Sequence, residues 1–432
     1  MNATKYVLSL EKYPNARCLD GSPGAFYVSR PSMVATSTKF YLYQDGGGFC
    51  ADLEHCVSRA NTSLGSSARV FWPESLDLDA ENPYMGFSRS LEENPLLASW
   101  THVFLVYCDG AYFSGSNATP THVGDTILHF RGRDIFLATL AELSDAHGLG
   151  DASSDVMLGG CSAGGIATLA HADWAARALA ASPVGAEAAR FSAFPISGFY
   201  LDVDYFTSQK AFPFLQSNVS EVLPQACLTV HAAQPHKCLV GEVNAPYLES
   251  AVFAWQSKFD ADQLATSFPP PGCADAACAD PYARRMVASL HSALWQNRSA
   301  NGGFLEGCWQ HCWDTPDPRD TVAQIAMPDG VTPLQALASW YTRTPSDNGH
   351  RKRTWEQTAS TFPCRNCCSV VTASSGAHVL PSYHSAPSLF DPPPLVAFFV
   401  STLALAGAVA AFAVACAWHF RKKQPTRLFS LA

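Results

Sequence analysis

Basic clusters are scarce in this chain of 432 residues. It contains 28 Lys and Arg against 37 Asp and Glu, giving a net charge of −9. Its basic runs are no longer than three residues, 351–353 and 421–423 near the C-terminus. Because binding to nucleic acid needs a positive patch, the sequence excludes a nucleic-acid partner. Internal repeats are absent as well, so the length points to one large domain with appendages.

Paired C-x₂-C zinc motifs are also missing, although the chain has 15 cysteines. Neither Cys364 with Cys367 and Cys368, nor Cys308 with Cys312, has histidines at the usual zinc-ligand spacing. No metal site and no cofactor are therefore predicted. So many cysteines instead favour disulfides and an oxidising compartment. Five N-x-S/T sequons agree with the secretory pathway, at Asn2, Asn61, Asn117, Asn218 and Asn297.

Charged residues are absent from 395–418, a run of 24 apolar and small residues. About 20 such residues span a bilayer, and the basic residues 421–423 mark the cytoplasmic side. The sequence predicts a luminal or extracellular domain over 1–373, a Ser/Pro-rich stalk over 374–394, a transmembrane helix over 395–418 and a cytoplasmic tail over 419–432. A buried core helix is the alternative for the apolar run.

An apolar secretory signal is missing from residues 1–17. Either the given sequence is truncated at its start or the C-terminal span alone directs insertion. We favour truncation, because a domain of nearly 400 residues is difficult to translocate behind a late signal.

Apolar runs that favour strands alternate with helical patterns in the first half of the chain. Strands are predicted over 39–43, 102–107, 153–158 and 251–256, and helices over 133–143, 163–181 and 281–295. This alternation is typical of an α/β fold with a mainly parallel sheet and flanking helices. The irregular segment 206–246 predicts an inserted, cap-like region above the sheet.

Ser162 lies in the motif Gly160-Cys161-Ser162-Ala163-Gly164, between a predicted strand and an Ala-rich helix. Glycines on both sides of the serine allow a sharp turn that exposes its hydroxyl. The amide after the serine, on Ala163, then lies at a helix N-terminus and is aimed at the reacting atom. The pattern predicts a nucleophile.

A nucleophilic serine needs a base and an acid, which follow it in the chain in this class of fold. Asp260 directly follows the apolar run and is the first candidate acid; Asp262 is the fallback, and Asp202 and Asp204 compete. Among the later histidines, His311 is the candidate base, with a buried structural histidine as the alternative. The others lie in a predicted surface helix, a polar run, the stalk or the membrane border: His291, His350, His378, His384 and His419.

Gly46-Gly47-Gly48 follows an early predicted strand. Glycines there allow the backbone to approach a tetrahedral intermediate closely, so this loop is a candidate oxyanion site, with the Ala163 amide as the second donor. A flexible turn is the alternative reading of the three glycines.

Several segments together resemble the pectinacetylesterase and Notum family of α/β-hydrolase-like carboxylesterases. They are, in chain order, Cys18-Leu19-Asp20-Gly21-Ser22-Pro23, Asp45-Gly46-Gly47-Gly48-Phe49-Cys50, Tyr107-Cys108-Asp109-Gly110, Gly160-Cys161-Ser162-Ala163-Gly164-Gly165, Phe259-Asp260 with Gln263, and Cys308 with His311-Cys312. Asp45 and Phe49 depart from the family's Glu and Trp.

The resemblance implies a triad of Ser162, Asp260 and His311, with oxyanion donors Gly47, Gly48 and Ala163. It also implies disulfides between Cys18 and Cys108 and between Cys50 and Cys56.

We expect a serine carboxylesterase that acts through an acyl-enzyme on the O-acetyl groups of a pectin-like polysaccharide. A Notum-like lipid-acyl protein deacylase is the first alternative, and a catalytically inactive glycan- or lipid-binding ectodomain is the second. The oligomeric state is left open by the sequence.

Overall fold

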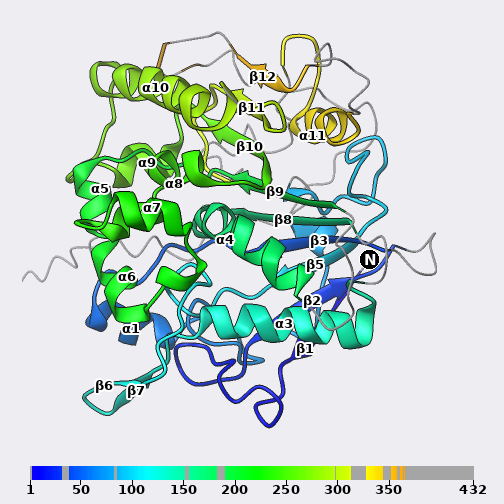
Figure 1. Cartoon of the computed structure of the whole chain (residues 1–432), viewed down its shortest axis with the longest axis vertical. Helices are drawn as coiled ribbons and strands as arrows, with labels where there is room; N and C mark the ends of the chain where they lie inside the picture. Colours follow the sequence, from blue (N-terminus) through cyan, green and yellow to red (C-terminus); the bar gives the residue numbers. More distant parts are fainter. Residues whose placement is uncertain are drawn as a thin grey trace, which may run out of the picture. The chain divides into compact units, whose positions relative to one another are not determined.

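Ten of the described strands form one sheet, in the order β12-β11-β10-β9-β8-β3-β5-β2-β1-β4 (Figure 1). This computed structural model describes residues 2–31, 38–81, 85–150, 155–181, 190–296, 298–312, 327–343, 352–357, 361–362 and 364. They all belong to one compact unit within 1–375.

The strands of the large sheet are β1 Ala3–Val7, β2 Ala25–Ser29, β3 Lys39–Gln44, β4 Ser75–Leu76, β5 Thr101–Leu105, β8 Asp155–Cys161, β9 Arg190–Ile196, β10 Ala251–Ser257, β11 Gly302–Glu306 and β12 Thr354–Glu356. A separate hairpin pairs β6 Thr121–Val123 with β7 Thr126–Leu128. The helices are α1 Leu53–Ala60, α2 Leu78–Glu81, α3 Gly132–His147, α4 Ala163–Ala180, α5 Asp204–Ser208, α6 Ala211–Ser217, α7 Gln225–Val230, α8 Gly241–Asn244, α9 Ala261–Thr266, α10 Ala276–Leu290 and α11 Pro333–Tyr341.

Seven neighbouring strands, from β12 to β5, pair in parallel, whereas β2, β1 and β4 pair antiparallel at one edge. The central strands are almost wholly buried; in β10 only the first residue is partly exposed. Strands buried on both faces are apolar throughout, which is why their runs stand out in the sequence. The predicted mainly parallel sheet with flanking helices is confirmed.

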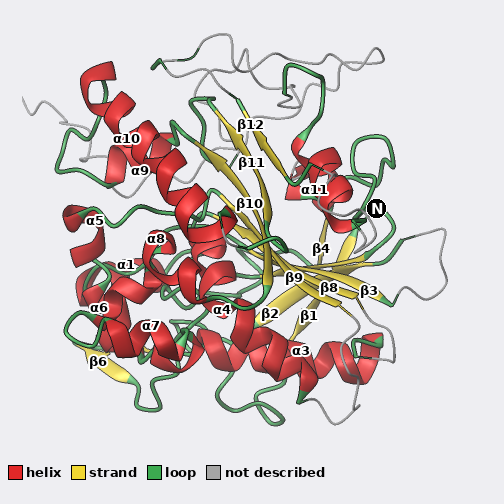
Figure 2. Ribbon diagram, turned by 45° about the horizontal axis from the view of Figure 1, so that its top comes forward, coloured by secondary structure: helices red, strands yellow, loops and turns green. Residues whose placement is uncertain are grey.

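Helices cover both faces of the sheet (Figure 2). Successive side chains of a strand point to opposite faces. On one face, Phe253 of β10 packs against Trp340 of α11, with ring centroids 5.4 Å apart. The next residue, Ala254, therefore points to the opposite face. It belongs to a hydrophobic cluster with Leu169 of α4 and Met286 of α10.

Several element boundaries differ from the sequence predictions. The helix predicted to begin at Pro281 begins at Ala276, because the Asp275 side chain accepts a hydrogen bond from the Cys278 amide and caps it earlier. The predicted insertion over 206–246 consists of short helices, α5 to α8. The antiparallel strands β1, β2 and β4 were not predicted, nor were the parallel strands β9, β11 and β12.

The helices of the described residues are all too short or too polar to cross a bilayer. The predicted stalk, transmembrane segment and tail, 374–432, lie outside the described residues.

Five disulfides join described residues: Cys18–Cys108, Cys50–Cys56, Cys161–Cys312, Cys227–Cys238 and Cys273–Cys278. They agree with passage through the secretory pathway.

We expect replacement of Cys18 and Cys108 together by Ala to lower the free energy of unfolding by about 4 to 5 kcal/mol. This bond closes a loop across 90 residues, and its loss enlarges the conformational entropy of the unfolded chain. The matched control is Cys273→Ala with Cys278→Ala, whose loop spans 5 residues and whose loss costs about 2 kcal/mol. Urea unfolding measures both; equal losses in the two variants contradict the loop-entropy explanation.

Candidate active site

Ser162 lies at the turn between β8 and α4 with φ 57° and ψ −121°, a conformation that non-glycine residues rarely adopt. Backbone contacts hold this turn: the Ser162 amide donates to the Ile196 carbonyl at 3.1 Å. The turn is also closely packed, since a Cβ on Gly164 would lie 1.9 Å from the Gln44 carbonyl oxygen. The glycine at 164 is therefore a steric requirement of the turn that presents the serine.

Asp260 follows β10 and is fully buried. Its Oδ1 accepts hydrogen bonds from the Gln263 amide at 3.0 Å and from His311 Nδ1 at 2.8 Å. Its Oδ2 accepts from Gln256 Nε2 at 3.1 Å. These donors satisfy a carboxylate that has no access to water. The structure thus brings the predicted acid and the predicted base into direct contact.

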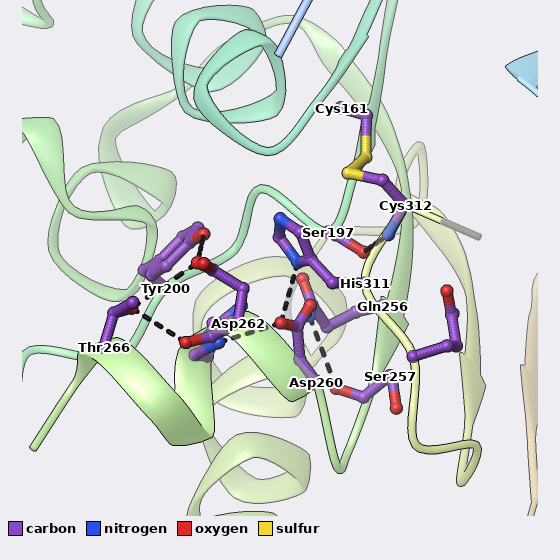
Figure 3. A network of polar contacts seen from close by, with 12 residues as sticks. Cys161, Ser197, Tyr200, Gln256, Ser257, Asp260, Asp262, Thr266, His311 and Cys312 are labelled. Carbon is purple, nitrogen blue, oxygen red and sulfur yellow. Dashed lines mark hydrogen bonds and ion pairs between the residues drawn. A yellow bond between two sulfur atoms is a disulfide. The ribbon is translucent and has the colours of Figure 1, made fainter. Parts of the chain in front are cut away.

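His311 lies in the loop after β11, and its side chain is 14% exposed. With Nδ1 hydrogen-bonded to Asp260, the ring orientation is fixed and Nε2 is the nitrogen left for proton transfer (Figure 3). The loop is itself held to the strand before α9: Ser257 Oγ donates to the Cys308 carbonyl at 2.5 Å, and the Ala261 amide donates to the Gln310 carbonyl at 3.2 Å.

A disulfide connects the serine turn to the histidine loop. Cys161 precedes Ser162, Cys312 follows His311, and their Cα atoms are 5.9 Å apart (Figure 3). The serine and the histidine, although far apart in sequence, are therefore each one residue from the same covalent bond. This pairing was not predicted.

Gly46, Gly47 and Gly48 follow β3 and lie against the serine turn. A Cβ on Gly46 would be 3.3 Å from Cβ of Ser162. Gly47 and Gly48 have φ of 129° and 68°, values that only glycine adopts readily. On the other side of the serine, the Ala163 amide is at the N-terminus of α4, where the first amides have no acceptor within the helix. Gly46 thus lies against Ser162, and Ala163 follows the serine directly; the amides of Gly47, Gly48 and Ala163 stay predicted oxyanion donors.

All these segments follow the carboxyl ends of neighbouring parallel strands: β3, β8, β10 and β11. In open α/β sheets this is the edge at which ligands bind. The sheet topology therefore brings together the residues predicted from four separate parts of the sequence.

Asp262, the fallback acid, is turned away from His311 and accepts a hydrogen bond from the Tyr200 hydroxyl at 2.8 Å (Figure 3). Burial raises the pKa of Tyr200 well above its usual value, whereas a side-chain hydrogen bond with Ser162 lowers it. Tyr200 therefore lies near the predicted nucleophile, and sequence reasoning missed it. The available signal was its place just after the buried strand β9.

Lys210 is a second missed residue. It is fully buried, and its Nζ lies 3.5 Å from the ring centroid of Phe49 and 3.6 Å from that of Phe206. Burial lowers the pKa of this amine well below its usual value, opposed by the charge of Asp262. An amine is thus enclosed by aromatic rings beside the glycine loop.

The competing acids lie elsewhere. Asp202 accepts from Lys237 Nζ at 2.8 Å and from Thr207, and Asp204 is an exposed residue of α5. His291 is exposed and contacts Glu356 at 3.0 Å. His350, His378, His384 and His419 lie outside the described residues.

Of the predicted glycosylation sites, Asn61 and Asn218 are exposed, as is Asn2. Asn117 is half-buried, and its side-chain amide donates to the Gln216 carbonyl at 2.9 Å. Asn297 is not among the described residues. Within the described parts of the chain, no three His, Cys, Asp or Glu side chains are grouped to hold a metal ion.

A model of the pectinacetylesterase family matches residues 2–369. The chain belongs to this family. Its members are carboxylic ester hydrolases, so the chain is one as well. The resemblance noted from the sequence motifs is thereby confirmed.

Curated relatives include pectin acetylesterase 11 of Arabidopsis thaliana, 26% identical over 76% of this chain and 84% of the relative. Pectin acetylesterase 4 of the same plant is 32% identical over 61% of each chain. The palmitoleoyl-protein carboxylesterase NOTUM of Drosophila melanogaster is 28% identical over 57% of this chain, but this covers only 36% of that longer protein.

Among solved structures, the Wnt deacylase Notum from Drosophila matches with a TM-score of 0.68 and 23% identity. The match covers 86% of this chain and all of that chain. It shows that the two proteins share a fold.

We expect Cys161→Ala with Cys312→Ala to lower kcat for 4-nitrophenyl acetate by about 100-fold. Without the covalent link, the loop of His311 is free to shift relative to Ser162, and a misplacement of about 1 Å has an effect of this size. Cys227→Ala with Cys238→Ala is the control, because it removes a disulfide between α7 and the turn before α8. Retention of full activity by the first variant contradicts the positioning role of this bond.

Glu306 supports the histidine loop, accepting from the Cys308 amide and from Gln310 Nε2, both at 2.5 Å. Burial raises its pKa to about 8. In the folded chain the carboxyl therefore holds its proton at pH values where the unfolded chain has lost it. The contribution of Glu306 to the free energy of unfolding is therefore fully present below the ordinary pKa of Glu. It is lost as the pH rises toward 8.

Accordingly, the wild-type protein should lose free energy of unfolding between pH 5 and pH 8, and Glu306→Gln should lose less over the same range. Urea unfolding at several pH values measures this slope. The exposed Glu249→Gln is the control and should retain the wild-type slope. An unchanged slope in Glu306→Gln refutes the assignment.

Proposed function

We propose that this chain is a serine carboxylesterase that removes O-acetyl groups from a pectin-like polysaccharide. Ser162 is the nucleophile, His311 the general base, and Asp260 the carboxylate that orients His311. The observation that supports this best is the 2.8 Å hydrogen bond between the buried Asp260 and His311, in a loop that a disulfide ties to the Ser162 turn.

In the proposed reaction, Ser162 Oγ attacks the ester carbonyl while His311 Nε2 takes its proton. The amides of Gly47, Gly48 and Ala163 receive the negative charge that forms on the carbonyl oxygen. His311 then returns the proton to the leaving sugar hydroxyl, which leaves an acyl-enzyme. A water molecule, deprotonated by His311, hydrolyses that intermediate and releases the carboxylic acid.

The substrate class rests on the curated pectin acetylesterases and on the polar groups beside Ser162. Tyr200 and Asp262 form a hydrogen-bonded pair next to the nucleophile, and Asp262 is partly exposed. A long acyl chain gains about 0.8 kcal/mol for each CH₂ only where apolar groups enclose it. Contact with a carboxylate and a hydroxyl opposes that gain, so this side of the site favours a short acyl group.

The second candidate is a lipid-acyl protein deacylase, which is favoured by the NOTUM relatives and by the shared fold.

We also propose that the apolar segment 395–418 anchors the enzyme to a membrane, with the catalytic residues on the luminal or extracellular side. Its absence of charge and the basic residues that follow it support this arrangement.

Hydrolysis of 4-nitrophenyl esters of increasing chain length tests the proposal. We expect kcat/KM to be highest for acetate and to fall with chain length. Ser162→Ala should be inactive and should resist labelling by a fluorophosphonate, whereas the control Ser208→Ala, changed on α5, should behave as wild type. A preference for chains of about eight carbons or more rejects the acetyl substrate in favour of the lipid-acyl one. Labelling of neither wild type nor variant indicates a binding protein.

A further inference from the structure

Two buried side chains hold the glycine loop from the side of α1 and β5. Nη1 of Arg59, on α1, donates to the Gly47 carbonyl oxygen at 2.8 Å. The hydroxyl of Tyr107, after β5, donates to the Gly48 carbonyl oxygen at 2.7 Å. Arg59 is 2% exposed and Tyr107 is fully buried.

These bonds determine where the loop amides point. In a trans peptide group the C=O and the N–H point in opposite directions. A donor on the Gly47 carbonyl therefore directs the Gly48 amide in the opposite direction within that peptide plane. Glycines at positive φ have no Cβ to fix their orientation, so peptide planes of a Gly-Gly-Gly loop rotate easily unless something holds them.

Arg59 has an unusual environment for a buried arginine. Its Nε and Nη2 have no hydrogen-bond partner among the described residues, and no carboxylate of the described residues forms an ion pair with it. Burial lowers its pKa, although Tyr107 and Asp109 oppose the shift, and arginine remains charged under such conditions. Its guanidinium carbon also lies 5.6 Å from the ring centroid of Tyr107. A buried cation with one hydrogen bond and one aromatic contact among the described residues is costly for folding, which calls for a reason other than stability.

A half-buried arginine, Arg89, shows the contrast. Arg89 donates to the carbonyl oxygens of Ala98, Trp100 and Ser29 and to the Ser29 hydroxyl, at 2.7 to 3.0 Å. Its guanidinium ties together several segments of the chain, as a structural arginine does. Arg59, in contrast, makes one side-chain hydrogen bond within the described parts of the chain, to the Gly47 carbonyl oxygen.

A disulfide joins α1, the helix that carries Arg59, to the residue that ends the glycine loop's segment. Cys56, on the same helix as Arg59, is bonded to Cys50, which follows the loop. The Cys50 amide also donates to the Gly110 carbonyl at 2.8 Å. The guanidinium is thus held under Gly47 by covalent structure as well as by its own hydrogen bond.

We propose that Arg59 is a positioning residue for the oxyanion site: through the Gly47 carbonyl it orients and polarises the Gly48 amide that receives the developing negative charge. A charged donor on a carbonyl oxygen draws electron density along the peptide group and makes its N–H a stronger donor. Because the donor is fixed before the reaction, no reorganisation is needed when the charge forms. This inference rests on the proposed role of Gly48 in ester hydrolysis.

The test compares Arg59→Met and Arg59→Lys with the control Arg89→Lys. Loss of one oxyanion donor reduces kcat by about 100- to 1,000-fold, and Arg59 acts on such a donor indirectly. We therefore expect Arg59→Met to lower kcat for 4-nitrophenyl acetate about 10- to 100-fold with KM within about twofold. The kcat of Arg59→Lys should lie between that of Arg59→Met and that of the wild type. Arg89→Lys should lower the melting temperature and leave kcat unchanged.

An alkyl boronic acid supplies a readout that a purely structural role does not move. It adds to a serine nucleophile and mimics the tetrahedral intermediate, whatever the natural ester is. Its affinity should fall in Arg59→Met by the same factor as kcat. Tyr107→Phe, which removes one hydroxyl from the loop's support, should lower both values about two- to tenfold and provides a test if the Arg59 variants do not fold.

Unchanged boronate affinity in folded Arg59 and Tyr107 variants overturns the inference, as does a change in KM without a change in kcat. Binding of the boronate to wild type but not to Ser162→Ala establishes the nucleophile separately. If wild type shows no Ser162-dependent binding, the proposed function fails and this inference fails with it. If that binding is present and the Arg59 variants keep full affinity, only the positioning role is rejected.

Discussion

The burial of the Asp260 carboxylate is the constraint on which the arrangement of the site depends. A charge removed from water must be surrounded by donors, and Asp260 obtains them from three segments: Gln256 at the end of β10, the amide of Gln263 in α9, and His311 from the loop after β11. Satisfying this one group therefore fixes the path of the chain at three places. The orientation of the imidazole follows from the same requirement.

Local patterns were sufficient for the parts of the fold that depend on local chemistry. Strands β3, β5, β8 and β10 contain the apolar runs that predicted them, whereas β9 and β11 were not predicted, and the Ser162 turn carries its glycines within a few residues. Asp260 was chosen because it directly follows a buried strand, and the structure places it against His311. The antiparallel strands β1, β2 and β4 escaped prediction because their pairing partners, rather than their own sequences, determine them.

What the sequence could not supply are contacts between distant segments. Fifteen cysteines allow too many pairings for Cys161 and Cys312 to be matched without a fold. Tyr200 and Asp262 resemble ordinary loop residues until β9 and β10 bring them side by side. Arg59 lies in an amphipathic helix, where an arginine is usually a surface residue. In each case the fold brings the side chain to the site, and the residue type alone does not reveal that position.

The Cys161–Cys312 bond also has a topological consequence. It closes a ring of backbone that contains α4, β9, the short helices α5 to α8, β10, α9, α10 and β11. A peptide bond broken anywhere inside this ring leaves both halves of the chain covalently attached at Cys161 and Cys312. The serine and the histidine therefore stay in one molecule even when a protease cuts a segment between them.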